Sequence, residues 1–312
     1  MIDTPQAGAG DDAQMTLPVH DGVAIADIRA TVATWFAGCA RDLPWRSPGT
    51  TPWGVLVSEI MLQQTPASRV AGPWLDWLNR WPTPGDLAAA DTSDVLRAWG
   101  SLGYPRRALR LHQCAVAIST GFGGQVRDDE AALLALPGIG RYTTAAVLAF
   151  AFGRRSLVLD VNIRRVLARV DGGVEHPTRS ETAAERRRAW DWVPEADRDA
   201  ATWSAAAMEL GATTCTARTP RCDECPIAQH CTWLRAGKPA WDGPARVAQA
   251  WDGTDRQCRG WIMAALRAAH SPVALADIVW ADAEQRQRCA ASLVIDGLAQ
   301  HVPAGLTLPG TP

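Results

Sequence analysis

The chain has 312 residues, enough for two domains, and 47% of them are apolar, so most of the chain is expected to fold. The net charge is −2, so overall charge predicts no nucleic-acid partner, and such a partner must be inferred from local charge. Neither a membrane-spanning run nor the apolar core of a signal peptide is evident, and we expect a cytoplasmic protein without a membrane partner. In that compartment, eight cysteines indicate metal or cluster ligation before disulfides.

Alanine and leucine dominate the sequence and β-branched runs are short, which favours an all-α body. Residues 1–22 are predicted to form a disordered tail, and the first helix is predicted at about 23–40. A second helix is predicted at about 53–64, ending before Pro66 because a residue that precedes proline disfavours the helical conformation. Further helices are predicted at about 68–80, 85–90, 92–100, 181–192 and 197–211, and others begin near Arg106 and Arg141.

The second predicted helix carries Glu59 within the sequence SEIMLQQT, next to Ile60 and Met61. If Glu59 is buried there, desolvation raises the pKa of its carboxyl, which suits a general acid near neutral pH. On spacing alone, an ordinary exposed glutamate on an amphipathic helix is the preferred interpretation.

A Pro-Gly-Ile-Gly turn at 137–140 separates two helical patterns. A turn that leads into a helix leaves backbone N–H groups unpaired, and these groups suit an anion such as phosphate. Asp160 follows as the only acid between Arg141 and Arg169, a stretch that holds six arginines. The stretch 95–127 holds five arginines and no acid. A charge run is often only a solvated face, but two such stretches around one turn indicate a DNA-facing side.

Four cysteines lie close together with the spacing C-x6-C-x2-C-x5-C: Cys215, Cys222, Cys225 and Cys231. Four thiolates within this short segment fit either structural zinc or an iron–sulfur cluster, and disulfide pairing is the remaining alternative. The other four cysteines are scattered over helical patterns and are predicted to be small core residues.

Residues 238–253 are rich in Pro, Gly and Ala and are predicted to form a linker. Beyond it, helices are predicted at about 255–269, 274–281 and 283–295, followed by a β-hairpin in LAQHVPAGLTL. This order is typical of a winged-helix module. Six arginines and six acids between 246 and 296 give no evident DNA-binding signal, so packing against the rest of the chain is an equal alternative.

Four separated motifs occur in a fixed order: LPWR with SEIMLQQT, GSLGYPRRALRLH, LPGIGRYTTAA with LVLDVNIRRVLAR, and the four cysteines. Together they resemble the helix-hairpin-helix DNA glycosylase and endonuclease III superfamily, and most closely its adenine DNA glycosylases. The resemblance covers roughly 24–232 and implies an all-α, two-module fold. The implied modules are an iron–sulfur cluster module at 23–48 and 156–237, a six-helix module at 49–155, and a winged-helix-like unit at 254–312.

The resemblance implies that the protein excises adenine mispaired with 8-oxoguanine or guanine in double-stranded DNA, as a monomer in the cytoplasm near the nucleoid. The family extrudes the base, because a glycosidic bond within stacked DNA is inaccessible to side chains. By position, Glu59 protonates the adenine ring, which reverses the interpretation from spacing, and Asp160 stabilises the oxocarbenium-like sugar. Tyr142 stands where strand-cleaving relatives carry a Schiff-base lysine, so a monofunctional enzyme is implied. Asn162 also matches an active-site position.

The same resemblance implies a [4Fe-4S] cluster on the four cysteines and a monovalent cation at the hairpin. It places the active site in the cleft between the two modules. The positions that match DNA-contacting residues of the family are Arg46, Gln63, Gln64, Tyr104, Gly138, Gly140 and Arg141.

Two departures from the family pattern concern recognition of the opposite base. Tyr104 is followed by Pro105 where two aromatic residues are usual, and residues 232–312 are too few and too helical for the MutT-like domain of typical members. Either a weaker preference for 8-oxoguanine than in full-length relatives or its recognition by another surface is therefore expected. Three alternatives to an adenine glycosylase remain. The first is a thymine or uracil mismatch glycosylase, which has less need of Glu59, and the second is an endonuclease III-like lyase, which Tyr142 disfavours. The third is a non-catalytic DNA-binding protein.

Overall fold

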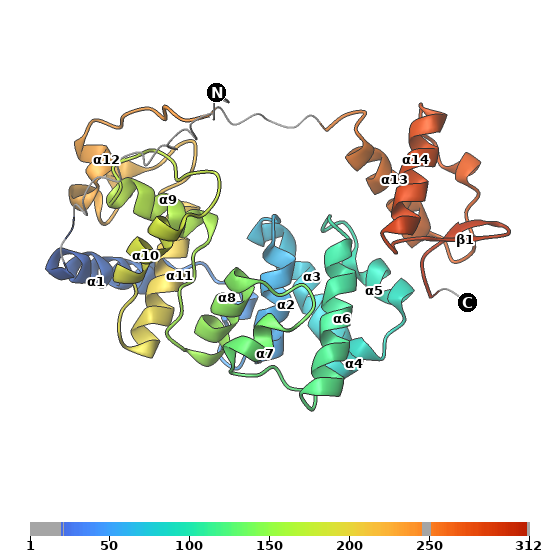
Figure 1. The fold of residues 1–312 in the computed structure, drawn as a ribbon, viewed down its shortest axis with the longest axis horizontal. Helices are drawn as coiled ribbons and strands as arrows, with labels where there is room; N and C mark the ends of the chain where they lie inside the picture. Colours follow the sequence, from blue (N-terminus) through green and yellow to red (C-terminus); the bar gives the residue numbers. More distant parts are fainter. Residues whose placement is uncertain (1–19, 21, 245–250, 311–312) are drawn as a thin grey trace, which may run out of the picture. The chain divides into compact units, whose positions relative to one another are not determined.

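A computed structural model describes residues 20, 22–244 and 251–310, and the all-α body is confirmed (Figure 1). The α-helices are α1 Gly22–Cys39, α2 Pro52–Leu62, α3 Ala67–Arg80, α4 Pro84–Ala88, α5 Thr92–Trp99, α6 Arg106–Gly121, α7 Glu130–Leu134, α8 Arg141–Phe152, α9 Val161–Val170, α10 Ala183–Asp191, α11 Asp197–Thr213, α12 Thr232–Arg235, α13 Asp255–Ala268 and α14 Ala283–Ile295. The strands are β1 Gln300–Val302 and β2 Gly305–Thr307, and the short 3-10 helices are η1 Pro44–Arg46, η2 Cys222–Glu224, η3 Ala228–His230 and η4 Leu275–Asp277. Among the described helices, none is long and apolar enough to cross a membrane.

The chain forms two compact units, each built from separate segments. The cluster unit, named for its four neighbouring cysteines, consists of Met1–Ala40, Leu159–Pro194 and Thr202–Gly243. The hairpin unit, named for the turn before α8, consists of Arg41–Val158, Glu195–Ala201 and Pro244–Pro312. The structure thus separates the units after Ala40, whereas the sequence predicts the corresponding boundary after residue 48.

Helix α2 lies at the centre of the hairpin unit. Its sequence PWGVLVSEIML is apolar on almost every side, and all its residues from Trp53 to Met61 are buried. A helix without a polar face must be surrounded, and α2 packs against α3, α6 and α8. Thr51 caps its N-terminus by accepting a hydrogen bond from Gly54 N at 3.1 Å. The hairpin itself is formed by α7, the turn 137–140 and α8.

The cluster unit buries the apolar faces of α1 and α9, including Ile25, Ile28 and Ile163. His20 precedes α1 and is also buried, with its Nε2 3.1 Å from the carbonyl oxygen of Val170. The predicted tail is therefore wrong at His20, whose ring has a specific partner, and the rest of that prediction lies mostly outside the described residues.

The C-terminal helices and strands belong to the hairpin unit. The two strands pair antiparallel as predicted, with His301 opposite Leu306. The helix predicted at 274–281 is wrong, because Val273 forms a bridge to Leu306 and only the short η4 follows. Arg97 of α5 donates to the carbonyl oxygens of Arg267 and Ala269, each at 2.7 Å. The C-terminal segment therefore packs against the helical body, as the alternative interpretation predicts.

Candidate active site and cysteine cluster

Glu59 lies in the second half of α2 and is only 5% exposed. Its neighbours along the helix, Ser58 and Ile60, are equally buried. The interpretation as an exposed glutamate of an amphipathic helix is therefore wrong, because α2 has no solvated face. Arg46, in η1 of the same unit, is partly buried and directs Nη1 to the carbonyl oxygen of Arg41 at 3.4 Å.

Two turns of the hairpin unit carry non-glycine residues in the left-handed backbone region. Gln64 follows the α2 cap residue Gln63 and has φ 56°, and Tyr104 precedes α6 with φ 46°. Such residues are uncommon and gather at functional sites. Thr65 Oγ1 donates to the Leu102 carbonyl oxygen at 3.3 Å, so the two turns are directly linked. Gln64 and Tyr104 are exposed, Tyr104 by 41%.

The turn before α8 contains two glycines with different constraints. Gly138 has φ +78°, and a Cβ atom there would lie 2.9 Å from Arg110 Cβ, so the fold itself requires glycine. Gly140 caps α8 with extended backbone, and nothing lies within 4 Å of a Cβ placed there. The first turn of α8 then presents Arg141, which is exposed, and Tyr142, which is partly buried.

Asp160 caps the N-terminus of α9 in the cluster unit. Its carboxylate accepts hydrogen bonds from Asn162 N at 3.0 Å, Ile163 N at 2.7 Å and Asn162 Nδ2 at 2.7 Å. Burial raises the pKa of Asp160, while these hydrogen bonds and the charge of Arg165 oppose that rise. The predicted site residues Asp160 and Asn162 are thus in direct contact.

Asn162 is held in turn by Arg165, a residue that the sequence did not single out. Arg165 Nη2 donates to Asn162 Oδ1 at 2.8 Å and to Gly211 O at 2.6 Å, and Nε donates to Cys215 O at 2.8 Å. Gly211 is required here, because a Cβ on it would lie 2.7 Å from Asn162 Cβ. The available signal was the spacing of Asn162 and Arg165, three residues apart on one face of α9.

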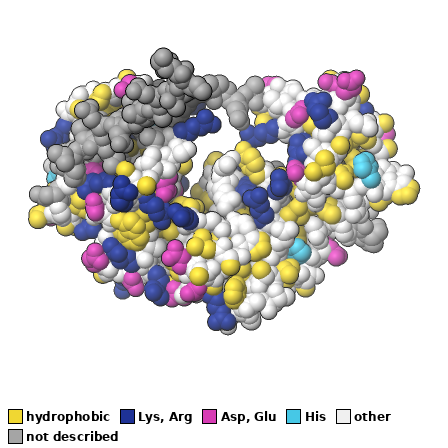
Figure 2. All heavy atoms as spheres, in the orientation of Figure 1, with side chains coloured by type: hydrophobic (Ala, Val, Ile, Leu, Met, Phe, Trp, Pro, Cys, Tyr) yellow, Lys and Arg dark blue, Asp and Glu magenta, His cyan; other side chains and the backbone are white. Residues whose placement is uncertain are grey.

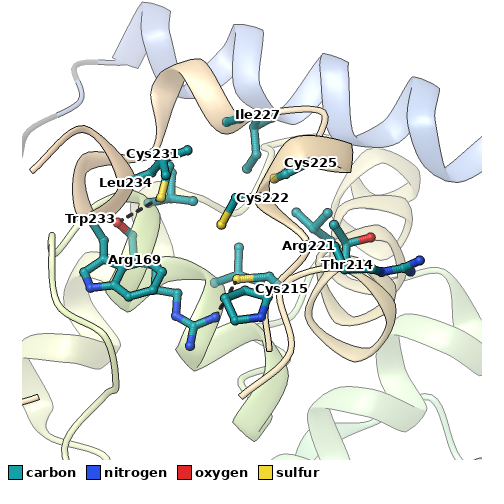
Figure 3. A pocket seen from close by; sticks show the side chains of 15 residues that line it. Arg169, Thr214, Cys215, Arg221, Cys222, Cys225, Ile227, Cys231, Trp233 and Leu234 are labelled. Atoms are coloured by element: carbon teal, nitrogen blue, oxygen red, sulfur yellow. Dashed lines mark hydrogen bonds between the residues drawn. The ribbon is translucent and has the colours of Figure 1, made fainter. Parts of the chain in front are cut away.

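The four cysteines of the predicted ligand set surround one cavity, which Ile227, Trp233 and Leu234 also line (Figure 3). Burial, with a smaller contribution from the three other thiols, raises the pKa of Cys225 to about 11. Four neighbouring thiols that are partly or fully buried can ionise together only when a cation compensates for their charge, which is what bound iron supplies. The donor set and its apolar surroundings therefore fit an iron–sulfur cluster.

Arg169 extends from α9 to the same cavity and is 1% exposed. It donates to Cys215 Sγ at 3.3 Å and to Thr216 O at 2.8 Å, and its guanidinium carbon lies 4.7 Å from the centre of the Trp233 ring (Figure 3). A cation beside a thiolate ligand stabilises the ionised form.

These contacts show that only part of the arginine-rich stretches can contribute to a DNA-facing side. Arg165 and Arg169 are buried, and Arg164 is paired with Glu185 at 2.6 Å. Figure 2 shows acidic side chains interspersed with basic ones over the face in view. Several of these arginines bond carbonyl groups inside the fold, so the local excess of arginine does not measure surface charge.

A model of the HhH-GPD superfamily of base excision DNA repair proteins matches residues 57–192, and one of the iron–sulfur binding domain of endonuclease III matches 215–231. The adenine DNA glycosylase of Mycobacterium tuberculosis is 49% identical over 280 residues, which cover 88% of this chain and 91% of that relative. The chain belongs to the adenine DNA glycosylase family. It is an adenine-specific DNA glycosylase with an iron–sulfur binding domain at residues 215–231.

Two further relatives of this adenine glycosylase extend the comparison. A thymine/uracil-DNA glycosylase of Pyrobaculum aerophilum is 32% identical over 215 residues, covering 67% of this chain and 92% of that relative. The solved structure of a thermostable thymine-DNA glycosylase matches with a TM-score of 0.61 and 26% identity, covering 68% of this chain and 97% of the other. The helix-hairpin-helix glycosylase fold predicted from the four motifs is confirmed.

Proposed function

We propose that this adenine DNA glycosylase excises adenine mispaired with 8-oxoguanine or guanine from duplex DNA, as a monofunctional enzyme and as a monomer. The observation that carries the proposal is the burial of Glu59 in α2, within a chain of this family. Excision of a purine is assisted by protonation of its ring, and a carboxylic acid shielded from water is suited to give that proton.

In the proposed reaction, Glu59 donates a proton to a ring nitrogen of the extruded adenine. The bond between the sugar C1′ and the base breaks, and its electron pair remains with the protonated base. The ionised carboxylate of Asp160 stabilises the positive charge that develops on the sugar. Water then adds to C1′ and releases a proton to the solvent, from which the Glu59 carboxylate is protonated again. This division between an acid and a carboxylate parallels the two carboxyl roles of glycoside hydrolases.

Tyr142, at the hairpin, determines in this proposal whether the DNA strand is cut. A phenol has no amine to attack the sugar, so no Schiff base forms at this position and the DNA strand is left intact. Asn162 orients Asp160 through the 2.7 Å hydrogen bond from its Nδ2. Gly138, Gly140 and Arg141 contact a DNA phosphate in this proposal, with a monovalent cation at the turn.

We propose that the cluster is of the [4Fe-4S] type. When bound, it would cross-link four positions within residues 215–231 and have no part in the hydrolysis. Cys215 connects it to the site, because its carbonyl oxygen accepts from Arg165 and Arg165 donates to Asn162. Cluster binding therefore supports the orientation of Asp160 through Arg165 and Asn162.

A single-turnover panel tests the proposal with duplexes that carry adenine, thymine or uracil opposite guanine or 8-oxoguanine, each with and without alkali. The expected result is release of adenine from both mispairs, with strand breaks only after alkali. The ratio of the two adenine-release rates measures the preference for 8-oxoguanine over guanine. Release of thymine or uracil alone would support the pyrimidine glycosylase, and DNA binding without release would support the non-catalytic alternative.

The role of Glu59 is tested by Glu59→Gln, which keeps the size of the side chain and removes the ionisable acid. Loss of a general acid lowers the rate by about 10²–10⁴-fold, while affinity for the mispaired duplex is expected to remain. Glu284→Gln, at an exposed glutamate of α14, is the matched control and is expected to leave excision unchanged. Unchanged excision by Glu59→Gln contradicts its role as the acid.

A further inference from the structure

Arg107, in the first turn of α6, is a buried cation with uncharged acceptors. Its side chain is 7% exposed and makes six hydrogen bonds, all to carbonyl or hydroxyl oxygens. Burial lowers the pKa of Arg107 to about 10, so the group is still charged at neutral pH. Burying such a charge is unfavourable unless hydrogen bonds compensate for it.

One half of the guanidinium closes the end of α2. Nη1 donates to Ile60 O and Met61 O, each at 2.9 Å, and to Gln63 O at 2.6 Å. The last carbonyl groups of a helix have no partner within the helix, and a cation there is stabilised by the helix dipole. Arg107 therefore fixes the point at which α2 ends and the chain enters the left-handed residue Gln64.

The other half of the guanidinium holds the second turn. Nη2 donates to Thr65 Oγ1 at 2.9 Å, to Leu102 O at 3.2 Å and to Gly103 O at 3.1 Å. The guanidinium carbon also lies 5.7 Å from the centre of the Tyr104 ring. Arg107 thus bonds both turns that the Thr65–Leu102 hydrogen bond joins.

We propose that Arg107 is a positioning residue that holds the Gln64 turn and the Tyr104 turn at a fixed separation, so that both enter the DNA together when adenine is extruded. This role rests on the proposed function, in which Gln64 and Tyr104 contact the duplex beside the target base. Both residues are exposed, whereas the group that connects them is buried. Their relative placement is accordingly set inside the protein before DNA binds.

The test uses Arg107→Lys, which keeps the charge but cannot present two nitrogens to the two turns at once. Thr65→Val is a milder second variant that removes only the shared hydroxyl. The matched control is Arg80→Met, because Arg80, like Arg107, lies over an aromatic ring, at 4.9 Å from the Trp81 ring centre, yet contacts neither turn. Single-turnover excision is measured on a duplex with adenine opposite 8-oxoguanine and on one with adenine opposite a tetrahydrofuran abasic analogue, where the adenine is already unpaired.

Small misplacements of groups that act on a substrate cost about 10²-fold in rate. We expect a loss of that order for Arg107→Lys on the mispaired duplex and a much smaller loss on the unpaired adenine, and a weaker effect in the same sense for Thr65→Val. Fluorescence of 2-aminopurine beside the target is expected to rise less with both variants than with wild type, because fewer complexes unstack the DNA. Arg80→Met is expected to match wild type in each assay.

Equal losses on both duplexes, with normal fluorescence, would show that Arg107 serves only to stabilise the fold and would overturn the proposal. If Arg107→Lys does not fold, the same comparison for Thr65→Val decides the outcome. Wild-type enzyme that releases adenine from neither duplex would instead overturn the proposed function, and the positioning role with it.

Discussion

Replacement of Asp160 separates two roles of one side chain, because this residue both caps α9 and is proposed to stabilise the cationic sugar. Asparagine is as good an N-cap as aspartate, whereas alanine cannot cap. Asp160→Asn can keep the hydrogen bonds from Asn162 N and Ile163 N, and it loses the charge. Asp160→Ala loses both the cap and the charge.

The expected magnitudes follow from these contacts. Loss of an N-cap costs about 0.5–2 kcal/mol, and loss of the bond from Asn162 Nδ2 costs about 1 kcal/mol more. A total of about 2 kcal/mol lowers the Tm of a unit of this size by about 4–8 °C. Burial raises the pKa of the Asp160 carboxyl in the native state. The protonated carboxyl therefore stabilises the native state at pH values below its ordinary pKa. This stabilisation is lost as the pH rises through the raised pKa. Removal of the charge in Asp160→Asn therefore offsets its lost hydrogen bond at pH 7.

We accordingly expect Asp160→Asn to keep the wild-type Tm within a few degrees and Asp160→Ala to lose about 4–8 °C. Both variants should excise adenine at least about 10²–10³-fold more slowly, the cost of removing one electrostatic stabiliser of a transition state. Thermal unfolding by circular dichroism and single-turnover excision at pH 7 measure the two effects. Excision by Asp160→Asn within tenfold of wild type would refute the role of the charge. An equal fall in Tm for both variants would refute the capping argument.

Three further changes have expected outcomes. Excision should fall as pH drops through the raised pKa of Asp160, above the usual range of aspartate, and a pH–rate profile from pH 4 to 8 measures this limb. Gly138→Ala should lower the free energy of unfolding by about 1–3 kcal/mol, because of the left-handed backbone and the contact with Arg110, and a lower Tm measures this. Gly140→Ala should fold normally, because nothing lies near its Cβ. Any loss of its DNA affinity, measured by fluorescence anisotropy, therefore reports a contact with DNA. Arg169→Met leaves buried carbonyl acceptors unpaired, which costs about 1–3 kcal/mol of stability each. The purified variant should therefore contain less iron per chain. Full iron content would contradict a role of Arg169 at the cluster.

The sequence predicted features that depend on local chemistry. The helix boundaries from α1 to α6 lie within about two residues of prediction, because prolines, glycines and capping residues act on their immediate neighbours. The ligand spacing of the four cysteines and the position of Asp160 just before a helix were evident for the same reason.

Features that depend on distant partners were not predictable. The burial of Glu59 follows from the helices that surround α2, and the spacing of its own segment did not indicate that burial. Arg107 and Arg169 looked like surface charge, although each donates to a carbonyl group more than 40 residues away in the chain, Ile60 O and Thr216 O respectively. The strand-like bridge at Val273 replaced a predicted helix because β2 pairs with it from beyond α14.

The division of the cluster unit into separate segments has a consequence for the order of folding during synthesis. His20 and its partner Val170 are 150 residues apart, and most of the hairpin unit lies between them. At roughly 5–20 residues per second, His20 and α1 are exposed for about 8–30 s before Val170 is made. Meanwhile the segment Arg41–Val158 can form its own core around α2. We therefore expect the cluster unit to close last, after the cysteines have been synthesised and iron can be bound.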